Sequence, residues 1–110
     1  MFEEYAWETV RRNYRLRDGW TRFEQPTLPS GSRPDNVLMN KNTEDFVVVE
    51  MKDVAELTQA HIAQVLAYIE EIGASRGFLV IAADTYVPPY LRRSARRKRI
   101  TIRRLTGWRG

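Results

Sequence analysis

The chain has 110 residues, a formal net charge of +4, one histidine and no cysteine. This length and a 43% share of hydrophobic residues favour one folded domain over a disordered chain. The composition excludes a disulfide framework, a thiolate metal site and a multi-histidine zinc centre. No apolar run reaches the roughly eighteen residues of a membrane span, and the acidic, amphipathic N-terminus is typical of neither a secretory signal nor a transit peptide. We therefore expect an intracellular, cytoplasmic protein.

The first third of the chain predicts a helix and a short strand. Apolar residues spaced three and four positions apart favour an amphipathic helix over residues 2–17, which Asp18-Gly19 would end. Residues 20–25 form a short strand candidate. The segment PTLPSGSRP at residues 26–34 is rich in turn-forming residues and predicts a loop.

A β-hairpin is predicted next. Val37-Leu38-Met39 begins a second strand, NKNTED at residues 40–45 forms the hairpin loop, and FVVVEMK at residues 46–52 forms a third strand. The run of four apolar residues in that third strand indicates burial on both faces.

The second half of the chain alternates helix and strand. A helical period runs from Glu56 to Ile72 with Gly73 as its C-cap residue, and an apolar strand follows over residues 78–83. A basic helix from Pro88 to Lys98 and a strand beginning at Ile100 complete the order α-β-β-β-α-β-α-β. Because a helix joins the third and fourth strands, these strands should be parallel. The fold class is therefore α/β, with a mixed β-sheet and flanking helices.

Charge is distributed unevenly within this single domain of residues 1–110. Residues 1–91 hold all 14 acidic residues and nine of the 18 basic residues, whereas residues 92–110 hold the other nine basic residues and no acid. A solvated helix and an arginine-guarded edge strand would give a similar composition. The absence of interspersed acids favours a polyanionic partner, and thus nucleic acid, because surface ion pairs need both signs.

The hairpin brings acidic residues together. Glu50 and Lys52 are two positions apart on a strand and share a face. Pairing of residues 35–39 with residues 46–50 would place Asp35 near Glu50, where two close carboxylates need a cation. Lys52 alone could be that cation and form a salt bridge. Alternatively, a divalent metal ion could bind there together with Lys52. Mg²⁺ suits carboxylates, a carbonyl such as that of Met51, and water, and this arrangement fits phosphodiester hydrolysis.

Pro34-Asp35 followed by Glu50-Met51-Lys52 after an apolar strand resembles the PD-(D/E)xK nuclease superfamily, also called restriction endonuclease-like. The element order resembles that superfamily's core, a three-layer sandwich, so the likeness covers most of the chain. It implies a metal-dependent endonuclease that uses Mg²⁺, with Mn²⁺ able to substitute. Asp35, Glu50 and the Met51 carbonyl would hold metal, and Lys52 would assist the attacking water.

Further matches resemble archaeal Holliday junction resolvases and RecB-like nucleases. Glu8 resembles the first-helix glutamate of the resolvases, which joins the metal site, although Glu3 and Glu4 compete for the role. Ser30 and Ser32 resemble the serine-containing flexible loop of those enzymes. Gln64 and Tyr68 resemble the QxxxY motif, whose residues support the active site and touch the DNA backbone; the alternative is a polar helix boundary with a packing tyrosine. His61 lies on the same strip and is expected to be a surface or boundary residue.

The resemblance implies a homodimeric, DNA-cleaving enzyme that acts on Holliday junctions. The alternatives are a restriction- or repair-type nuclease on linear DNA, an inactive nucleic-acid-binding module of the same fold, and a ribonuclease. Trp108 could stack on a base or pack on its own domain. Eight basic residues near the C-terminus are expected to contact phosphates: Arg92, Arg93, Arg96, Arg97, Lys98, Arg99, Arg103 and Arg104.

Overall fold

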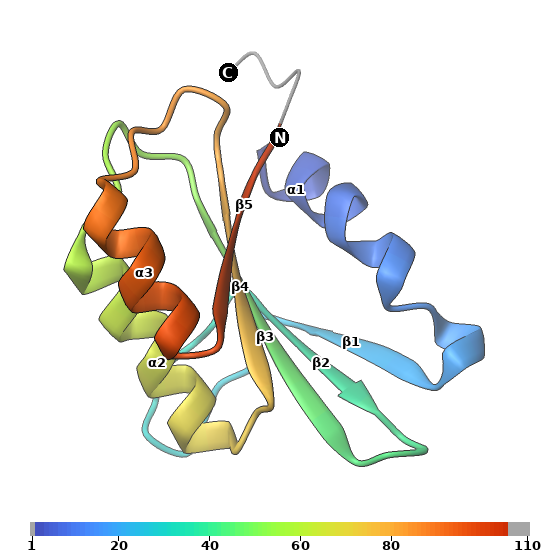
Figure 1. The fold of residues 1–110 in the computed structure, drawn as a ribbon. Coiled ribbons are helices and arrows are strands. Elements are labelled where there is room, and N and C mark those ends of the chain that lie inside the picture. The colour runs from blue at the N-terminus through green and yellow to red at the C-terminus, as the bar shows by residue number, and fades with distance from the viewer. Residues whose placement is uncertain (1, 106–110) are drawn as a thin grey trace.

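The computed structural model describes residues 2–105, without the side chains of Glu3 and Tyr5. One mixed sheet has the strand order β1-β2-β3-β4-β5, with helices on both of its faces (Figure 1), which confirms the predicted α/β class. The elements in chain order are α1 (Phe2–Val10), the 3-10 helices η1 (Arg11–Asn13) and η2 (Leu16–Asp18), β1 (Trp20–Glu24), β2 (Asn36–Asn40), β3 (Asp45–Lys52), α2 (Gln59–Ile72), β4 (Arg76–Ile81), α3 (Pro89–Arg97) and β5 (Ile100–Arg104).

The sheet combines an antiparallel meander with two parallel crossovers. Strands β1, β2 and β3 pair antiparallel, and β3, β4 and β5 pair parallel through α2 and α3, as the helix between the third and fourth strands predicts. The β2–β3 register sets Asn36 opposite Val49, so Asp35 comes opposite Glu50. The predicted hairpin register is confirmed.

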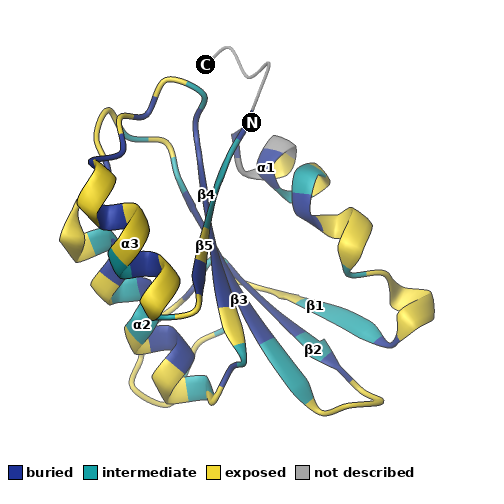
Figure 2. Ribbon diagram, in the orientation of Figure 1, coloured by how far each residue is buried: buried dark blue, intermediate teal, exposed yellow. Residues whose placement is uncertain are grey.

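The apolar run of β3 is buried on both faces of the sheet. Val48 packs in the cluster under α2 and α3, whereas Val47 and Val49 pack in the cluster under α1. Figure 2 shows the same arrangement, with dark blue strands between helices that are yellow on their outer surfaces. Because side chains alternate along a strand, Glu50 and Lys52 lie on the face of Val48, beneath α2.

The N-terminal helix is shorter than the predicted range of residues 2–17. Its buried apolar positions end at Val10, and the exposed residues that follow continue as two 3-10 turns. Gly19 ends the segment with φ +96°, where a Cβ atom would lie 2.5 Å from the side-chain nitrogen of Asn42, so both the backbone and the space favour glycine. At the other predicted stop, Gly73 has φ +76° and is the C-cap of α2, which is confirmed.

The basic C-terminal segment is part of the folded body. Ala95 of α3 and Ile100 of β5 are buried in the core beneath α2, and Leu105 is buried under α1. Within residues 2–105, no helix combines the length and apolar character needed to cross a bilayer. Trp108 lies outside the described residues.

Candidate active site

The two predicted carboxylates meet where β2 begins and β3 ends. The backbone N–H of Asp35 donates to Glu50 Oε1 at 2.9 Å, and the backbone N–H of Met51 donates to Asp35 Oδ2 at 2.8 Å. Each carboxylate is therefore held by the other residue's strand. These reciprocal hydrogen bonds fix both side chains at one corner of the sheet.

Pro34 cannot donate a backbone hydrogen bond to the Met51 carbonyl oxygen. Extending the antiparallel register beyond Asn36 and Val49 sets Met51 opposite Pro34, which has no N–H to donate. The N–H and C=O of one strand residue point to the same side. Because the Met51 N–H points to Asp35, we expect its carbonyl to face the same side of β3. Two carboxylates therefore meet at this corner, and the Met51 carbonyl is a candidate third oxygen there.

Glu50 is short of positive charge in this corner. Only 3% of the residue is exposed, and burial raises the pKa of its carboxyl from 4.5 to about 7, with the negative charge of Asp35 adding to the rise. The Asp35 backbone N–H and Lys52 act in the opposite direction. The Lys52 ammonium lies 3.5 Å from Glu50 Oε2, so its charge is close but does not offset the burial.

The donor set suits a hard divalent cation. Mg²⁺ prefers oxygen ligands, commonly one or two carboxylates with several waters, and a buried carboxylate that resists ionisation gains most from an added positive charge. Among the side chains that the structure describes, no third His, Asp or Glu joins Asp35 and Glu50. An ion at this corner would therefore be held by these two carboxylates, with the Met51 carbonyl and water completing its coordination.

Helix α2 brings Tyr68 near this corner, and Gln64 of the same helix is hydrogen-bonded to Tyr68. Thr58 is the N-cap of the helix, and its backbone N–H donates to His61 Nδ1 at 3.0 Å. Ile62 and Val65 of the helix are buried on the sheet. Burial raises the pKa of Tyr68, and the negative charges of Glu50 and Asp35 raise it further. A hydrogen bond with Gln64 acts against that rise. Tyr68 is thus close enough to the acidic pair for their charges to act on it.

Comparison with known proteins identifies the family of this chain. The family model described as the PD-(D/E)XK nuclease superfamily matches residues 21–93, which is about two thirds of the chain. The chain belongs to this superfamily. The matched range includes Asp35, Glu50, Lys52, Gln64 and Tyr68, and it leaves out Glu8.

Two solved structures share the fold of this PD-(D/E)XK chain. One is a complex of EndoMS with double-stranded DNA, at TM-score 0.64 and 20% identity over 98% of this chain and 46% of that one. The other is SfsA of Pyrococcus furiosus in complex with Ca²⁺, at TM-score 0.57 and 17% identity over 94% of this chain and 54% of that one. This chain therefore spans about half the length of both proteins. No curated protein sequence matches it.

The serine loop of the PD-(D/E)XK chain is attached to α2 by a residue that the motif search missed. Ser30 donates from its backbone N–H to Glu71 Oε2 at 2.9 Å and from its hydroxyl to Glu71 Oε1 at 2.7 Å. Ser30 and Ser32 are also joined through their hydroxyls at 3.0 Å. Glu71 lies three residues after Tyr68, on the neighbouring position of the helix surface. The sequence shows that Glu71 lies three residues after Tyr68, but it does not show that Glu71 binds Ser30, because this contact depends on how the loop folds.

Glu8 is not brought to the acidic pair. Its carboxylate forms an ion pair with Arg11 Nε at 2.7 Å, and both side chains are more than half exposed. Helix α1 also covers the sheet face opposite to that of Glu50 and Lys52 (Figure 1). The expected role of Glu8 in metal binding stays a prediction.

The eight basic residues near the C-terminus fall into two groups. Most lie on the outer side of α3 or just after it, where Arg92, Arg93, Arg96, Arg97 and Arg99 are exposed and Lys98 donates to Ser94 at 2.9 Å. The two on β5 contact the fold. The Arg103 guanidinium lies 5.6 Å from the Phe78 ring centroid, and Arg104 Nη1 donates to the carbonyls of Ala83 and Thr85 at 2.9 and 2.6 Å. The arginines on or just after α3 therefore present solvent-exposed positive charge.

Proposed function

We propose that this chain is an intracellular, metal-dependent endonuclease domain that hydrolyses DNA phosphodiester bonds. The observation that carries the proposal is the corner where the Asp35 and Glu50 carboxylates meet beside Lys52; the Met51 carbonyl is the third ligand that we propose. Mg²⁺ is the expected ion, with Mn²⁺ able to replace it. Residues 1–110 would act as one nuclease-like domain.

The chain's own residues divide the work in this proposal. Asp35 and Glu50 bind the ion, and hydrogen bonds from the backbone N–H groups of Asp35 and Met51 hold the two carboxylates in place before any ligand binds. Lys52 orients the attacking water and stabilises the charge that develops on the phosphate. When bound, a divalent ion lowers the pKa of its water and balances negative charge in the transition state. Tyr68 and Gln64 close the corner from the side of α2.

DNA is the preferred substrate for two reasons. One structural neighbour is a complex of EndoMS with double-stranded DNA, and the exposed arginines of α3 supply phosphate contacts that do not depend on sequence. Branched DNA of the Holliday junction type is the first choice, and linear duplex DNA is the second. A four-way junction is cut symmetrically by two sites, so the first choice implies a homodimer.

Cleavage assays on defined substrates test the proposal. Purified protein is incubated with a four-way junction, a linear duplex and an RNA of matched sequence, with Mg²⁺, Mn²⁺ or EDTA. Selective nicking of the junction supports a resolvase, and equal cutting of the duplex supports a restriction- or repair-type enzyme. Cutting of RNA alone would identify a ribonuclease. Binding without cleavage under either ion would identify an inactive module and overturn the catalytic assignment.

The decisive variant is Lys52→Ala. We expect its cleavage rate to fall by about a hundred-fold or more, because it removes a preorganised charge from the reacting centre, while DNA affinity measured in Ca²⁺ stays near that of wild type. Lys41→Ala, an exposed change in the β2–β3 turn, is the matched control and should cut normally. A Lys52→Ala protein that cuts as fast as wild type would remove Lys52 from the mechanism.

A further inference from the structure

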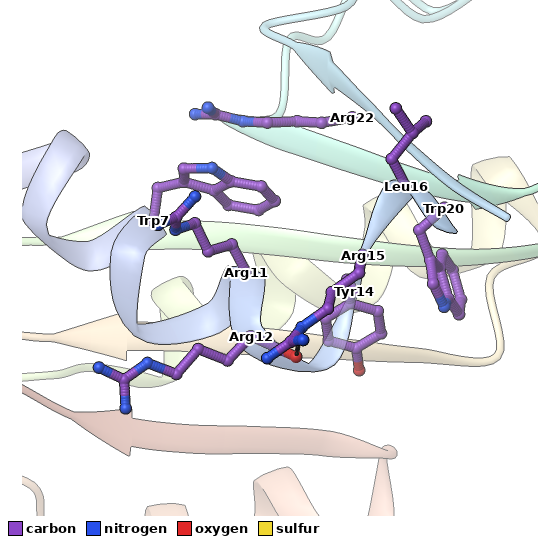
Figure 3. A pocket seen from close by; sticks show the side chains of 8 residues that line it. All are labelled: Trp7, Arg11, Arg12, Tyr14, Arg15, Leu16, Trp20 and Arg22. Carbon is purple, nitrogen blue, oxygen red and sulfur yellow. Dashed lines mark hydrogen bonds between the residues drawn. The ribbon is translucent and has the colours of Figure 1, made fainter. Parts of the chain in front are cut away.

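A groove on the α1 side of the sheet, opposite to the candidate active site, combines arginine and aromatic side chains. It has a volume of about 630 Å³ and lies between α1, the 3-10 turns and β1 (Figure 3). The described residues that line it are Trp7, Arg11, Arg12, Tyr14, Arg15, Leu16, Trp20 and Arg22. This volume lies within the range of about 300–1,000 Å³ that is typical of ligand sites.

The groove is separate from the candidate active site. Trp20 and Arg22 pair with Asn40 and Leu38, and Leu38 faces the core under α1. Glu50 and Lys52 face α2 instead. Arg22 Nε donates to Asn36 Oδ1 at 2.6 Å, and Asn36 follows Asp35, so the two sites are separated by the sheet rather than by a long distance. A ligand in the groove would lie on the face of the sheet opposite to the acidic corner.

Arginine gives the groove its charge. Four of the lining residues are arginines and none of these lining residues is an acid. Arg11 and Arg22 also pair with Glu8 and Glu24 at its margin. Arg12 and Arg15 are exposed, and the Arg12 carbonyl accepts from Arg15 Nε at 3.1 Å. The positive charges of these two side chains attract an anion.

The aromatic rings of the groove are held in place from below. Trp7, Tyr14 and Trp20 pack on the core under α1 and remain partly exposed. Arg22 stacks over the Trp7 ring at 4.0 Å from its centroid, and the Tyr14 and Trp20 rings meet edge to face at 4.8 Å between centroids. Rings fixed by the core lose little freedom when a ligand stacks on them.

Leu16 lies exposed among these charges. Its residue is 74% exposed in a segment otherwise made of arginines and polar residues. An apolar side chain at the rim of a charged groove adds a surface for a ligand that is itself partly apolar. A plain polyanion gains nothing from Leu16 or from the faces of Trp7 and Trp20, whereas a nucleobase gains from all of them.

We propose that this groove binds single-stranded nucleic acid. Unstacked bases would lie on Trp20, on the Leu16 rim and on the Arg22 guanidinium that covers the Trp7 ring, and Arg12 and Arg15 would contact the phosphates on either side. Duplex DNA hides its base faces within its own stack, so it could use only the arginines. The inference goes beyond the proposed nuclease, and it rests on that proposal only for the choice of nucleic acid as the anion.

Binding to a short oligonucleotide in EDTA tests the groove without any cleavage. The probe is a labelled oligothymidylate of about twelve nucleotides, a length that spans one such site, and fluorescence anisotropy gives its affinity. The double variant Arg12→Glu and Arg15→Glu should bind at least about ten-fold more weakly, and its salt slope should fall by about 0.7 for each lost phosphate contact. The matched control is Arg17→Glu with Lys41→Glu, two exposed changes of equal charge outside the groove.

Three results would overturn the proposal. One is an equal loss in the test and control variants, which would mean that net charge alone attracts the strand. Another is equal affinity for an abasic oligonucleotide of the same length, because stacked bases should improve affinity by about ten-fold. The third is equal or tighter binding of duplex DNA or of polyglutamate at the same groove. Because the assay is done in EDTA, it measures strand binding without cleavage. A protein that does not cleave DNA can still bind the strand in the groove, and a protein that cleaves DNA can lack this binding, so the two proposals are tested separately.

Discussion

Replacing Glu50 by Gln should stabilise the metal-free protein at alkaline pH. The fold holds the Glu50 carboxyl with 3% of the residue exposed and raises its pKa from 4.5 to about 7, mainly through burial. One pKa unit corresponds to about 1.4 kcal/mol, so keeping Glu50 ionised in the folded state costs about 3 kcal/mol. Gln has the same shape, carries no charge and can still accept the hydrogen bond from the Asp35 N–H.

The sign of the effect follows from proton binding. Between pH 4.5 and about 7 the unfolded chain has released the Glu50 proton and the folded chain has kept it. The native state then binds more protons, so stability falls as pH rises, and the full cost is present above the folded pKa. The advantage of Glu50→Gln should therefore be below about 1 kcal/mol near pH 5 and reach about 3 kcal/mol near pH 8.5.

Urea unfolding in EDTA at these two pH values measures the difference. Glu70→Gln, an exposed change on α2, is the matched control and should show no such pH dependence. Adding Mg²⁺ should stabilise wild type more than Glu50→Gln, because the variant keeps only the Asp35 carboxylate to bind the ion. An advantage that is absent, or that is the same at both pH values, would refute the reasoning that Glu50 is a buried charge in need of a cation.

Further predictions concern the supporting contacts. His61→Ala should lower the free energy of unfolding by about 1 kcal/mol, because it removes the cap of α2. Burial and Lys52 lower the pKa of His61. The stability lost in the variant should therefore shrink as pH falls below 6.5 and the wild-type histidine takes up its proton. Glu71→Ala should speed amide exchange at Ser30, with Glu70→Ala as control and no more than about 1 kcal/mol lost on unfolding. Arg104→Gln should lower stability by about 1–3 kcal/mol by leaving backbone carbonyls unpaired; a loss of DNA affinity without a loss of stability would instead make it a DNA contact.

Local patterns were enough to predict the centre of the sheet. The alternation along FVVVEMK places Glu50 and Lys52 on one face, and the length of the NKNTED loop sets the register that brings Asp35 opposite Glu50. Gly19 and Gly73 could be predicted to end their segments because glycine adopts a positive φ without strain. Both residues do have a positive φ in the structure. These features depend on residues close in sequence, and this is why one sequence was sufficient.

Features that depend on distant contacts could not be predicted in the same way. The bond between Ser30 and Glu71 joins residues 41 positions apart, and neither residue's neighbours indicate the partner. The expected phosphate-contacting role of Arg104 came from composition, whereas its guanidinium contacts carbonyls in the loop after β4. The predicted helix over residues 2–17 failed beyond Val10, because burial rather than spacing decides where α1 ends.

A salt bridge alone does not account for the charged end of β3. If Lys52 neutralised Glu50, the pKa of the carboxyl would lie below 4.5, as it does for a carboxylate beside a well-placed cation. It lies near 7 instead, although the ammonium is 3.5 Å away. The fold therefore carries a cost at Glu50 that its own lysine does not remove. Pro34 has no N–H with which to donate to the Met51 carbonyl at the same point, so that carbonyl could join the two carboxylates in binding a cation.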